Sequence, residues 1–297
     1  SNYNTTSPCV DLLASGTLVV GDATTGLDLG TVSGEGTLSV ETNDTDATEF
    51  PGGSYTNLLG ATGGTVEYTG TGNYTALNAP TAFRNLTISG SGTVTLPDAD
   101  LTLSGNIAFD GTVTTLISNA TNGDVSVGGN LTVNNASATL QFQSGTDRSI
   151  TVTGDITNTG SLQVAPGGFA THNISIGGSL TNSATLDLAN ATGLHHANVT
   201  FTGASNMSIT GTGGTTDFYR LIVNKGTDFS SELEVTATNF TLSAPTNTAE
   251  KALEIQNGTL KLSAAHSITL STGVGSFSNP SSGGLWINDA SAVAEIT

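Results

Sequence analysis

The stretch Val125-Ser126-Val127-Gly128-Gly129-Asn130-Leu131 alternates apolar and small polar residues, turns at two glycines and resumes with another apolar residue. Alternation with a period of two is typical of a β-strand that has one buried and one exposed face. Variants of the first five residues occur five times, and their final glycines are 24 or 25 residues apart. The five copies are 101–105, 125–129, 150–154, 174–178 and 199–203. A repeat of this length indicates a stack of similar structural units.

Further short apolar segments follow within each repeat. One begins directly after the glycine, as in Asn106-Ile107 and Asp155-Ile156. Another strand follows in most units, as at 138–142, 160–164 and 184–188, and similar strands occur at 36–40 and 258–262. A unit with two or three such strands cannot bury its apolar face alone and must stack on its neighbours. The sequence therefore predicts an all-β fold, a parallel β-solenoid (β-helix) with about 24 residues per coil.

We expect a single continuous solenoid over 1–297, because no segment has the length of a linker between domains. Residues 1–60 are predicted to form irregular N-terminal coils or a cap, and 61–226 regular coils. Within the regular region, Val66-Glu67-Tyr68-Thr69-Gly70 matches Val199-Thr200-Phe201-Thr202-Gly203 at an offset of 133 residues, which indicates an internal duplication. Residues 227–297 are predicted to form C-terminal coils.

The ends of a solenoid need cover, since a terminal coil presents unpaired backbone groups. We expect Val10 to Val20 to cover the N-terminal end. At the other end, 284–288 and 292–297 still have the pattern of strands, so the stack is expected to continue into another subunit or a longer chain. Trp286, the only tryptophan, is expected either to pack near this end or to contact a partner.

The charge balance excludes several classes of partner. Six lysines and arginines oppose 24 aspartates and glutamates, which gives a formal net charge of −18 at pH 7. Such a chain repels a polyphosphate backbone, so no nucleic acid is expected as a partner. No membrane insertion is expected either, because no apolar run approaches the roughly 20 residues that a spanning helix needs. Cys9, the only cysteine, is expected either to be buried in the first strand or to form an intermolecular bridge.

Candidate catalytic and metal-binding residues are few. The pairs Asp98 with Asp100 and Asp44 with Asp46 have a spacing that a glycoside hydrolase could use, but both lie in turn-like sequence and are expected to be solvated. Asp44, Asp46 and Glu49 are the calcium candidates, although the central glycine of a complete calcium loop is missing. We therefore predict no catalytic residue, no cofactor other than this calcium and no enzymatic activity.

Two adjacent histidines, His195 and His196, are the remaining metal-ligand candidates. Neighbouring residues of a strand point to opposite faces, so these two cannot bind one metal together. We expect both imidazoles to lie on the surface.

Thirteen of the 25 asparagines begin Asn-x-Ser/Thr, the acceptor pattern for N-linked glycans. Alternating strands generate this pattern by themselves, because asparagine at a turn is followed by an apolar residue and then threonine. The candidates Asn85, Asn130 and Asn198 are therefore either glycan attachment sites or products of the strand pattern.

Three phrases carry a resemblance to a known group of proteins: GTVEYTG at 64–70, RNLTISGSG at 84–92 and GLWIN at 284–288. They resemble the repetitive β-helical segments of large secreted cell-surface and adhesin-like proteins of Bacteroidota, exported by a type IX route. The resemblance covers nearly the whole chain. It implies an extracellular or cell-surface location and a structural or adhesive role. The C-terminal sorting domain typical of such proteins is not visible in this sequence.

The leading hypothesis is a non-enzymatic structural solenoid of the cell exterior, which extends a surface stalk or polymerises into a filament by end-to-end stacking or strand exchange. Its partners would be further copies of itself or cell-surface glycans. The alternative hypothesis is a carbohydrate-binding or carbohydrate-cleaving β-helix module, since many such enzymes have this fold.

Overall fold

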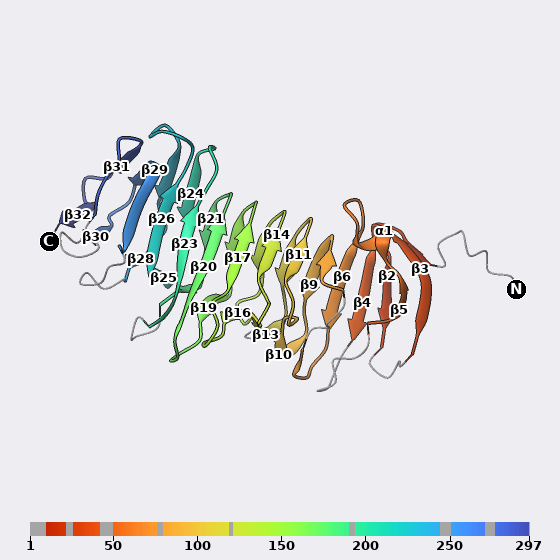
Figure 1. Cartoon of the computed structure of the whole chain (residues 1–297). Helices are drawn as coiled ribbons and strands as arrows, with labels where there is room; N and C mark the ends of the chain where they lie inside the picture. The colour runs from red at the N-terminus through yellow and green to blue at the C-terminus, as the bar shows by residue number, and fades with distance from the viewer. Residues whose placement is uncertain are drawn as a thin grey trace, which may run out of the picture. The chain divides into compact units, whose positions relative to one another are not determined.

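The computed structural model describes residues 10–21, 26–41, 50–75, 80–118, 121–189, 194–243, 251–270 and 277–296. Almost every element in these ranges is a short strand that pairs in parallel with a strand about 20 to 34 residues away. The only helix among them is the single turn α1 (Thr56–Leu59). The predicted parallel β-solenoid is therefore confirmed (Figure 1). Cys9 lies outside the described residues.

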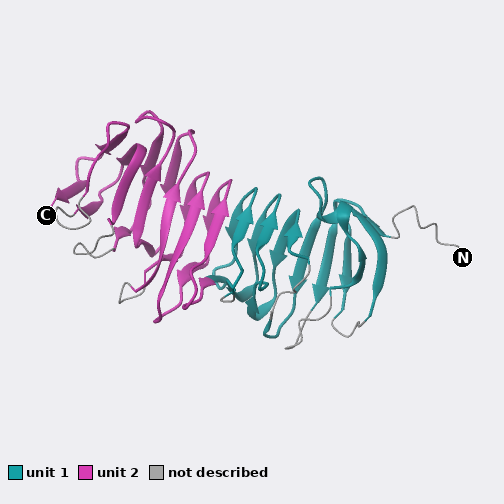
Figure 2. Ribbon diagram, in the orientation of Figure 1, with its two compact units in different colours: residues 1–140 teal, residues 141–297 magenta. Residues whose placement is uncertain are grey.

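The chain divides into two compact units, residues 1–140 and 141–297 (Figure 2). The boundary falls within the region predicted to form regular coils.

Unit 1 is built from three strands per coil in its regular part. Its first strands are β1 (Val10–Leu12), β3 (Asp28–Gly34), β5 (Gly52–Ser54), β8 (Ala82–Phe83), β11 (Leu101–Leu103) and β14 (Val125–Val127). Its second strands are β2 (Thr17–Val20), β4 (Thr37–Glu41), β6 (Thr65–Thr69), β9 (Asn85–Ile88), β12 (Ile107–Phe109) and β15 (Leu131–Val133). Its third strands are β7 (Tyr74–Thr75), β10 (Ser91–Thr95) and β13 (Thr112–Leu116), and β16 (Thr139–Phe142) leads the chain into unit 2.

The second strands of unit 1 form one continuous parallel ladder in which equivalent apolar residues stack in columns. One column contains Val20, Val40, Tyr68, Ile88, Phe109 and Val133. All six side chains are buried. Burying a side chain of this size contributes roughly 1.5–3 kcal/mol, so the column supplies a large part of the driving force for stacking.

Unit 2 repeats the same plan. Its first strands are β17 (Ser149–Val152), β20 (Ala170–Ile176), β23 (His195–Phe201), β26 (Arg220–Asn224) and the first half of β29 (Leu253–Leu262). Its second strands are β18 (Ile156–Asn158), β21 (Leu180–Asn182), β24 (Met207–Thr210), β27 (Glu232–Val235), the second half of β29 and β31 (Gly283–Ile287). Its third strands are β19 (Ser161–Val164), β22 (Thr185–Asp187), β25 (Thr215–Phe218) and β28 (Phe240–Leu242), and β30 (Ser267–Leu270) pairs with β32 (Val293–Ile296).

The turn between the first and second strands explains the recurring glycine and asparagine. The Oδ1 of Asn85 accepts the backbone N–H of Asn106 at 2.9 Å, and the Oδ1 of Asn106 accepts that of Asn130 at 2.8 Å. In unit 2 the Oδ1 of Asp155 accepts the N–H of Ser179 at 2.7 Å. We call this row of side-chain acceptors the corner ladder, formed by Asn85, Asn106 and Asn130 in unit 1 and by Asp155 and Ser179 in unit 2.

The glycines before Asn106, Asn130 and Ser179 are needed because the corner ladder leaves no space for a side chain there. A Cβ on Gly129 would overlap the Oδ1 of Asn106, and a Cβ on Gly178 would overlap the Oδ1 of Asp155. Any other residue would therefore push the coils apart at the point where their backbone hydrogen bonds continue.

The two copies of the predicted duplication occupy different positions in their coils. Val66 lies in β6, a second strand, whereas Val199 lies in β23, a first strand. Because every strand needs the same alternation, segments at different positions of the coil can have similar sequences.

The strands predicted at the C-terminal end are confirmed, whereas the cover expected at the N-terminal end is part of a coil. Residues 10–20 form β1 and β2, which pair with β3 and β4 and so belong to a coil rather than to a separate cover. Residues 284–288 and 292–297 correspond to β31 and β32 within the described range.

The corner geometry yields a first prediction. Replacing Gly129 by alanine should lower the free energy of unfolding by about 1–3 kcal/mol, because the new methyl group overlaps Asn106 and the backbone of Gly105. Gly214→Ala is the matched control, since a Cβ there meets no atom within 4 Å. Denaturant unfolding of the two variants measures the difference. Equal stabilities would contradict the role assigned to the corner glycine.

Candidate functional site

The carboxylates predicted from the sequence do not form a metal or catalytic site within the described residues. Asp44, Asp46 and Glu49 lie outside those residues. Asp98 and Asp100 lie exposed in a turn, as expected. The Oδ1 of Asp100 accepts two backbone N–H groups from the turn of the next coil. In the described part of the chain, no group of three or more His, Cys, Asp or Glu side chains could hold a metal ion.

The three glycan candidates differ in exposure. Asn130 is exposed and Asn85 is half-buried, with its amide engaged in the corner ladder. Asn198 is only 7% exposed, and its Oδ1 is buried without a hydrogen-bond partner. The folded chain does not expose this amide for modification, which favours the strand pattern as the origin of the acceptor motif at Asn198. Asn85 and Asn130 remain predictions.

The expectation that His195 and His196 lie on the surface is wrong. His195 is fully buried, and His196 is 5% exposed and stacks on Tyr219 with ring centroids 3.6 Å apart. The reason is that β20 and β23 extend beyond the repeated pentapeptide and pair over seven residues. In this extension His195 lies opposite Ala170, and His172 lies opposite Ala197, so a small residue in each coil makes room for an imidazole in the other.

Sequence reasoning missed His172, which is fully buried beside His195. The sequence does contain a signal, because His172 and His195 each have an alanine 25 residues away, at the position that pairs with them in the neighbouring coil. The sequence motifs A-T-H at 170–172 and H-H-A at 195–197 carry that signal.

The hydrogen bonds of the two buried histidines fix their tautomers. The backbone N–H of Arg148 donates to the Nδ1 of His172 at 3.0 Å, so the proton of a neutral His172 must sit on Nε2. That nitrogen lies 2.9 Å from the Nε2 of His195, which must accept. His195 then carries its proton on Nδ1 and donates it to the backbone oxygen of Ala165 at 2.8 Å. The chain of donors and acceptors is complete only when both rings are neutral.

The environment of His172 disfavours a positive charge. Burial lowers the pKa of His172 to about 4, with His195 as a further cause. Phe142 stacks on the ring at a centroid distance of 4.5 Å and supplies part of the apolar surroundings. His172 is therefore a neutral structural link between coils at neutral pH.

The lowered pKa predicts a dependence of stability on pH. Between the unfolded pKa near 6.5 and the folded pKa near 4, the unfolded chain binds a proton at this residue and the folded chain does not. Stability contributed by His172 is thus present above pH 6.5 and is lost as the pH falls, by up to about 1.4 kcal/mol per pH unit. His172→Phe should be less stable at pH 7 but should show a smaller decrease between pH 6.5 and 4.5 in denaturant unfolding.

The difference between wild type and variant isolates His172, because the other titratable groups are present in both proteins. His266, whose pKa is also lowered by burial, is one of them. Parallel pH profiles for the two proteins would contradict the assignment.

A second buried polar network joins the second and third strands of unit 2. Asn158 and Asn182 are fully buried, and the Nδ2 of Asn158 donates to the Oδ1 of Asn182 at 2.8 Å. The Nδ2 of Asn158 also donates to the backbone oxygen of Thr185 at 2.7 Å, and the Nδ2 of Asn182 donates to that of Thr215 at 2.6 Å. We call these two residues the internal asparagine pair. They satisfy backbone groups at a corner that no water can reach.

Replacing one member of the internal asparagine pair should be costly. Asn182→Ala leaves the Nδ2 of Asn158 and the backbone oxygen of Thr215 without these partners, and each unsatisfied buried group costs about 1–3 kcal/mol. The exposed Asn288, which donates to Ser263, is the control, and Asn288→Ala should change stability by less than about 1 kcal/mol. Thermal and denaturant unfolding of both variants measure the effect; equal losses would show that burial does not matter here.

Lys225 is buried, although nothing in its sequence position predicts burial. Its side chain is fully buried at the end of β26, and its Nζ donates to the backbone oxygen of Ser205 at 2.7 Å. Burial lowers the pKa of Lys225 to about 8. This lysine therefore ties two coils together from inside the turn.

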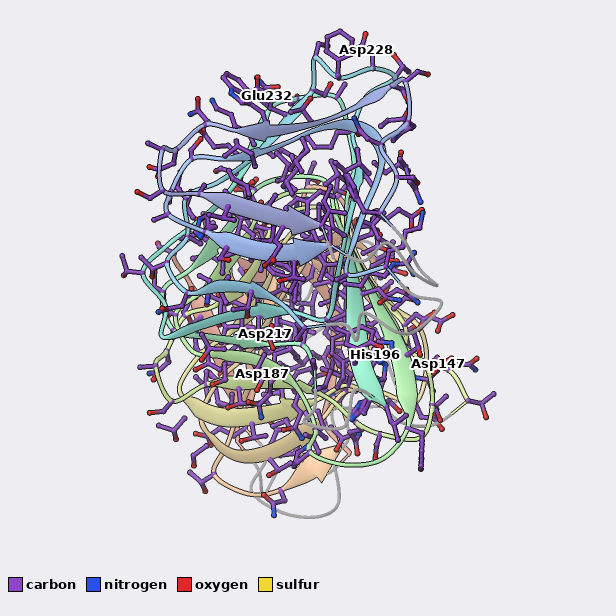
Figure 3. All side chains as sticks on the ribbon, turned by 90° about the vertical axis from the view of Figure 1, so that its left-hand side faces the viewer. Asp147, Asp187, His196, Asp217, Asp228 and Glu232 are labelled. Atoms are coloured by element: carbon purple, nitrogen blue, oxygen red, sulfur yellow. The ribbon has the colours of Figure 1, made fainter. Side chains whose placement is uncertain are left out.

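Two neighbouring third strands of unit 2, β22 and β25, carry paired acidic residues. Asp187 lies opposite Asp217 in the register of β22 and β25, and Figure 3 shows the two together on one side of the unit. Burial raises the pKa of Asp187, and Asp217 raises it further. Asp217 in turn accepts hydrogen bonds from Thr241 at 2.7 Å and Ser243 at 3.0 Å.

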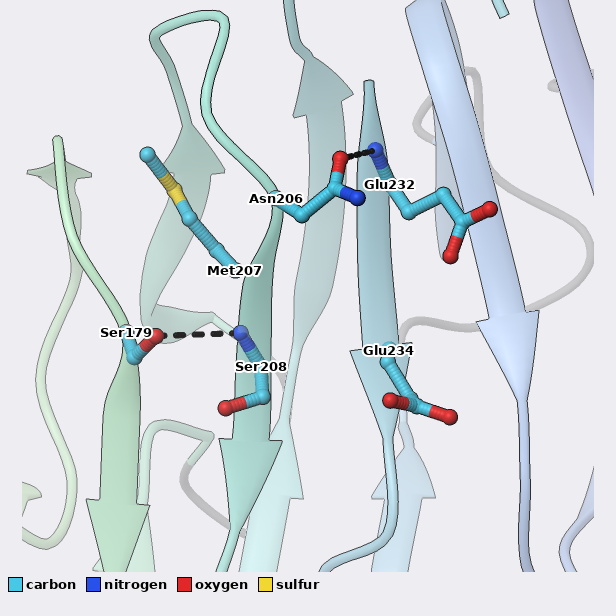
Figure 4. Close-up of a pocket in the computed structure, with 6 residues that line it drawn as sticks. All are labelled: Ser179, Asn206, Met207, Ser208, Glu232 and Glu234. Atoms are coloured by element: carbon cyan, nitrogen blue, oxygen red, sulfur yellow. Dashed lines mark hydrogen bonds between the residues drawn. The ribbon is translucent and has the colours of Figure 1, made fainter. Parts of the chain in front are cut away.

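A shallow cleft of about 240 Å³ lies over the second strands of unit 2 (Figure 4). It is lined by Ser179, Asn206, Met207, Ser208, Glu232 and Glu234. Two backbone contacts shape it: the Oγ of Ser179 accepts the N–H of Ser208 at 3.1 Å, and the Oδ1 of Asn206 accepts the N–H of Glu232 at 2.9 Å. These bonds continue the corner ladder, so the cleft opens where a wider coil interrupts the regular spacing.

Lys261 connects this cleft to the exposed Trp286. Its Nζ lies 3.2 Å from an oxygen of Glu234 and 3.7 Å from one of Glu232. The same Nζ lies 4.5 Å from the ring centroid of Trp286. The hydroxyl of Ser263 and the ammonium of Lys261 hold the pKa of Glu234 below its ordinary value.

Comparisons with known proteins do not assign this chain to a family. No protein-family model, no curated protein and no solved structure matches this chain. Among the described residues, no helix has the length and apolar character needed to cross a membrane.

Proposed function

We propose that this chain is a non-enzymatic structural element of the cell exterior, which extends a surface stalk or assembles into a filament. The observation that carries the proposal is the continuous parallel ladder within each unit, closed by the corner ladder and filled by columns of apolar side chains. Nearly all of the buried and hydrogen-bonded groups described above serve to join one coil to the next. An architecture of this kind gives extension and contact surface rather than an enclosed reaction site.

The composition supports an exterior location. The net charge of −18 and the small polar residues of the outward positions keep the flanks hydrated and oppose side-by-side association. Contacts between particles are then favoured at the ends of the stack, where backbone groups are unpaired.

The last described coil has the properties of a stacking surface. Ile287 in β31 and Val293 and Ile296 in β32 are exposed apolar residues. Within the described residues β31 and β32 each pair with one neighbour, so each offers one open edge. In the first described coil of unit 1, Leu13 and Val19 are exposed as well. The proposed occupant of this surface is a further coil of the same geometry, from a longer chain or from a second copy.

The filament form of the proposal predicts assembly that depends on this surface. The purified chain should form larger particles as its concentration rises, and the double variant Ile287→Lys, Ile296→Lys should shift assembly to at least about tenfold higher concentration, because lysine on an edge strand opposes strand pairing. Phe169→Lys is the control, since Phe169 is exposed at a turn of unit 2 away from β31 and β32. Sedimentation velocity and electron microscopy are the measurements.

The outcomes separate the two forms. Concentration-independent monomers would rule out the filament and leave the stalk. Immunogold labelling of intact cells tests the location itself, and labelling confined to the cytosol would overturn the proposal in both forms.

A further inference from the structure

The row of outward side chains beside the cleft runs across four neighbouring strands of unit 2. Ser208 lies opposite Glu234, which lies opposite Lys261, which lies opposite Trp286. Neighbouring strands are about 4.8 Å apart, so the row is about 14 Å long. It therefore presents polar groups and an aromatic ring at a regular spacing along the stack.

The cleft at one end of this row offers hydrogen-bonding groups, two of which make no hydrogen bond within the described residues. The Oδ1 of Asn206 accepts a backbone N–H, but its Nδ2 makes no hydrogen bond within the described residues, and neither does the Oγ of Ser208. The carboxylates of Glu232 and Glu234 keep 29% and 37% of their side-chain surface exposed. An amide donor, a hydroxyl and two carboxylate acceptors form a set that matches the hydroxyl groups of a sugar.

The aromatic end of the row supplies an apolar face. Trp286 is 46% exposed at the β31 end of the row. Sugar rings combine an apolar face of C–H groups with a polar rim, so they fit a surface that places an indole beside hydrogen-bonding groups.

The charges select among carbohydrates. Two carboxylates surround one ammonium at the site, and the whole chain has a net charge of −18, so a polyanionic sugar is repelled. We propose that the cleft and Trp286 form a binding site for a neutral oligosaccharide that lies across β24, β27, β29 and β31. The site goes beyond the proposed structural role and does not depend on it.

The arrangement favours binding over cleavage. A glycoside hydrolase needs one carboxyl group that stays protonated to serve as the acid. The contacts of Glu234 with Ser263 and Lys261 have the opposite effect, since both stabilise its ionised form.

The single tryptophan makes the test direct, because its fluorescence reports on Trp286 alone. The full chain is titrated with cellohexaose, xylohexaose, mannohexaose and chitohexaose, with hexagalacturonate as the anionic probe. We expect a saturable change in fluorescence, and a matching signal in calorimetry, with at least one neutral hexasaccharide and none with hexagalacturonate. The titration is done at a concentration where sedimentation shows one species, so that assembly cannot produce the signal.

Variants then place the binding at this site, with calorimetry as the measurement. Trp286→Ala and Asn206→Ala should each weaken binding at least about tenfold. Trp286→Phe keeps an aromatic ring and should retain measurable binding, which guards against a loss caused by misfolding. Phe169→Ala, at another exposed aromatic residue of unit 2, should bind as the wild type does.

Three results would overturn the inference: no response to any neutral hexasaccharide, an equal response to hexagalacturonate, or unchanged binding in both Trp286→Ala and Asn206→Ala. None of these results depends on whether the chain assembles, so failure of the site and failure of the structural role are distinguishable.

Discussion

The structure depends on one contact, in which a side-chain oxygen at the corner of a coil accepts the backbone N–H of the equivalent residue in the next coil. Asn85, Asn106 and Asp155 make this contact at 2.7–2.9 Å. The turn interrupts the strands on either side, so without these acceptors the ladder of hydrogen bonds would break there. The glycines before Asn106, Asn130 and Ser179 follow from the same contact, because the acceptor oxygen of the preceding coil occupies the space of a Cβ.

The same geometry explains how a narrow core tolerates polar residues. A buried group in a solenoid has its equivalent only one strand spacing away, so a hydrogen bond between equivalent or neighbouring positions satisfies both. His172 with His195 and Asn158 with Asn182 use this proximity. Burial of an unpaired imidazole or amide would cost several kcal/mol, whereas the paired groups hold successive coils in register.

The candidate binding cleft arises where the coil departs from its regular length. Between Ser179 and Asn206 the chain adds residues to the turn, and the second strand of the next coil begins farther along the sequence. The cleft lies at this irregularity, next to Glu232 and Glu234. Nothing in the sequence spacing of Glu232 and Glu234 indicates that Lys261 joins them to Trp286. The four residues come from three different coils.

The sequence by itself determined the strand alternation, the coil length and the corner motif, because these are local properties that repeat every 24 or 25 residues. The tertiary structure decided which polar residues enter the core and which strand of the coil a segment occupies. His195, His196 and Lys225 look like surface residues in the sequence and are buried in the fold, because strands that extend beyond the repeat and turns that close over a side chain create interior positions. Burial there depends on the small or hydrogen-bonding partner one coil away, and that partner is known only once the register is fixed.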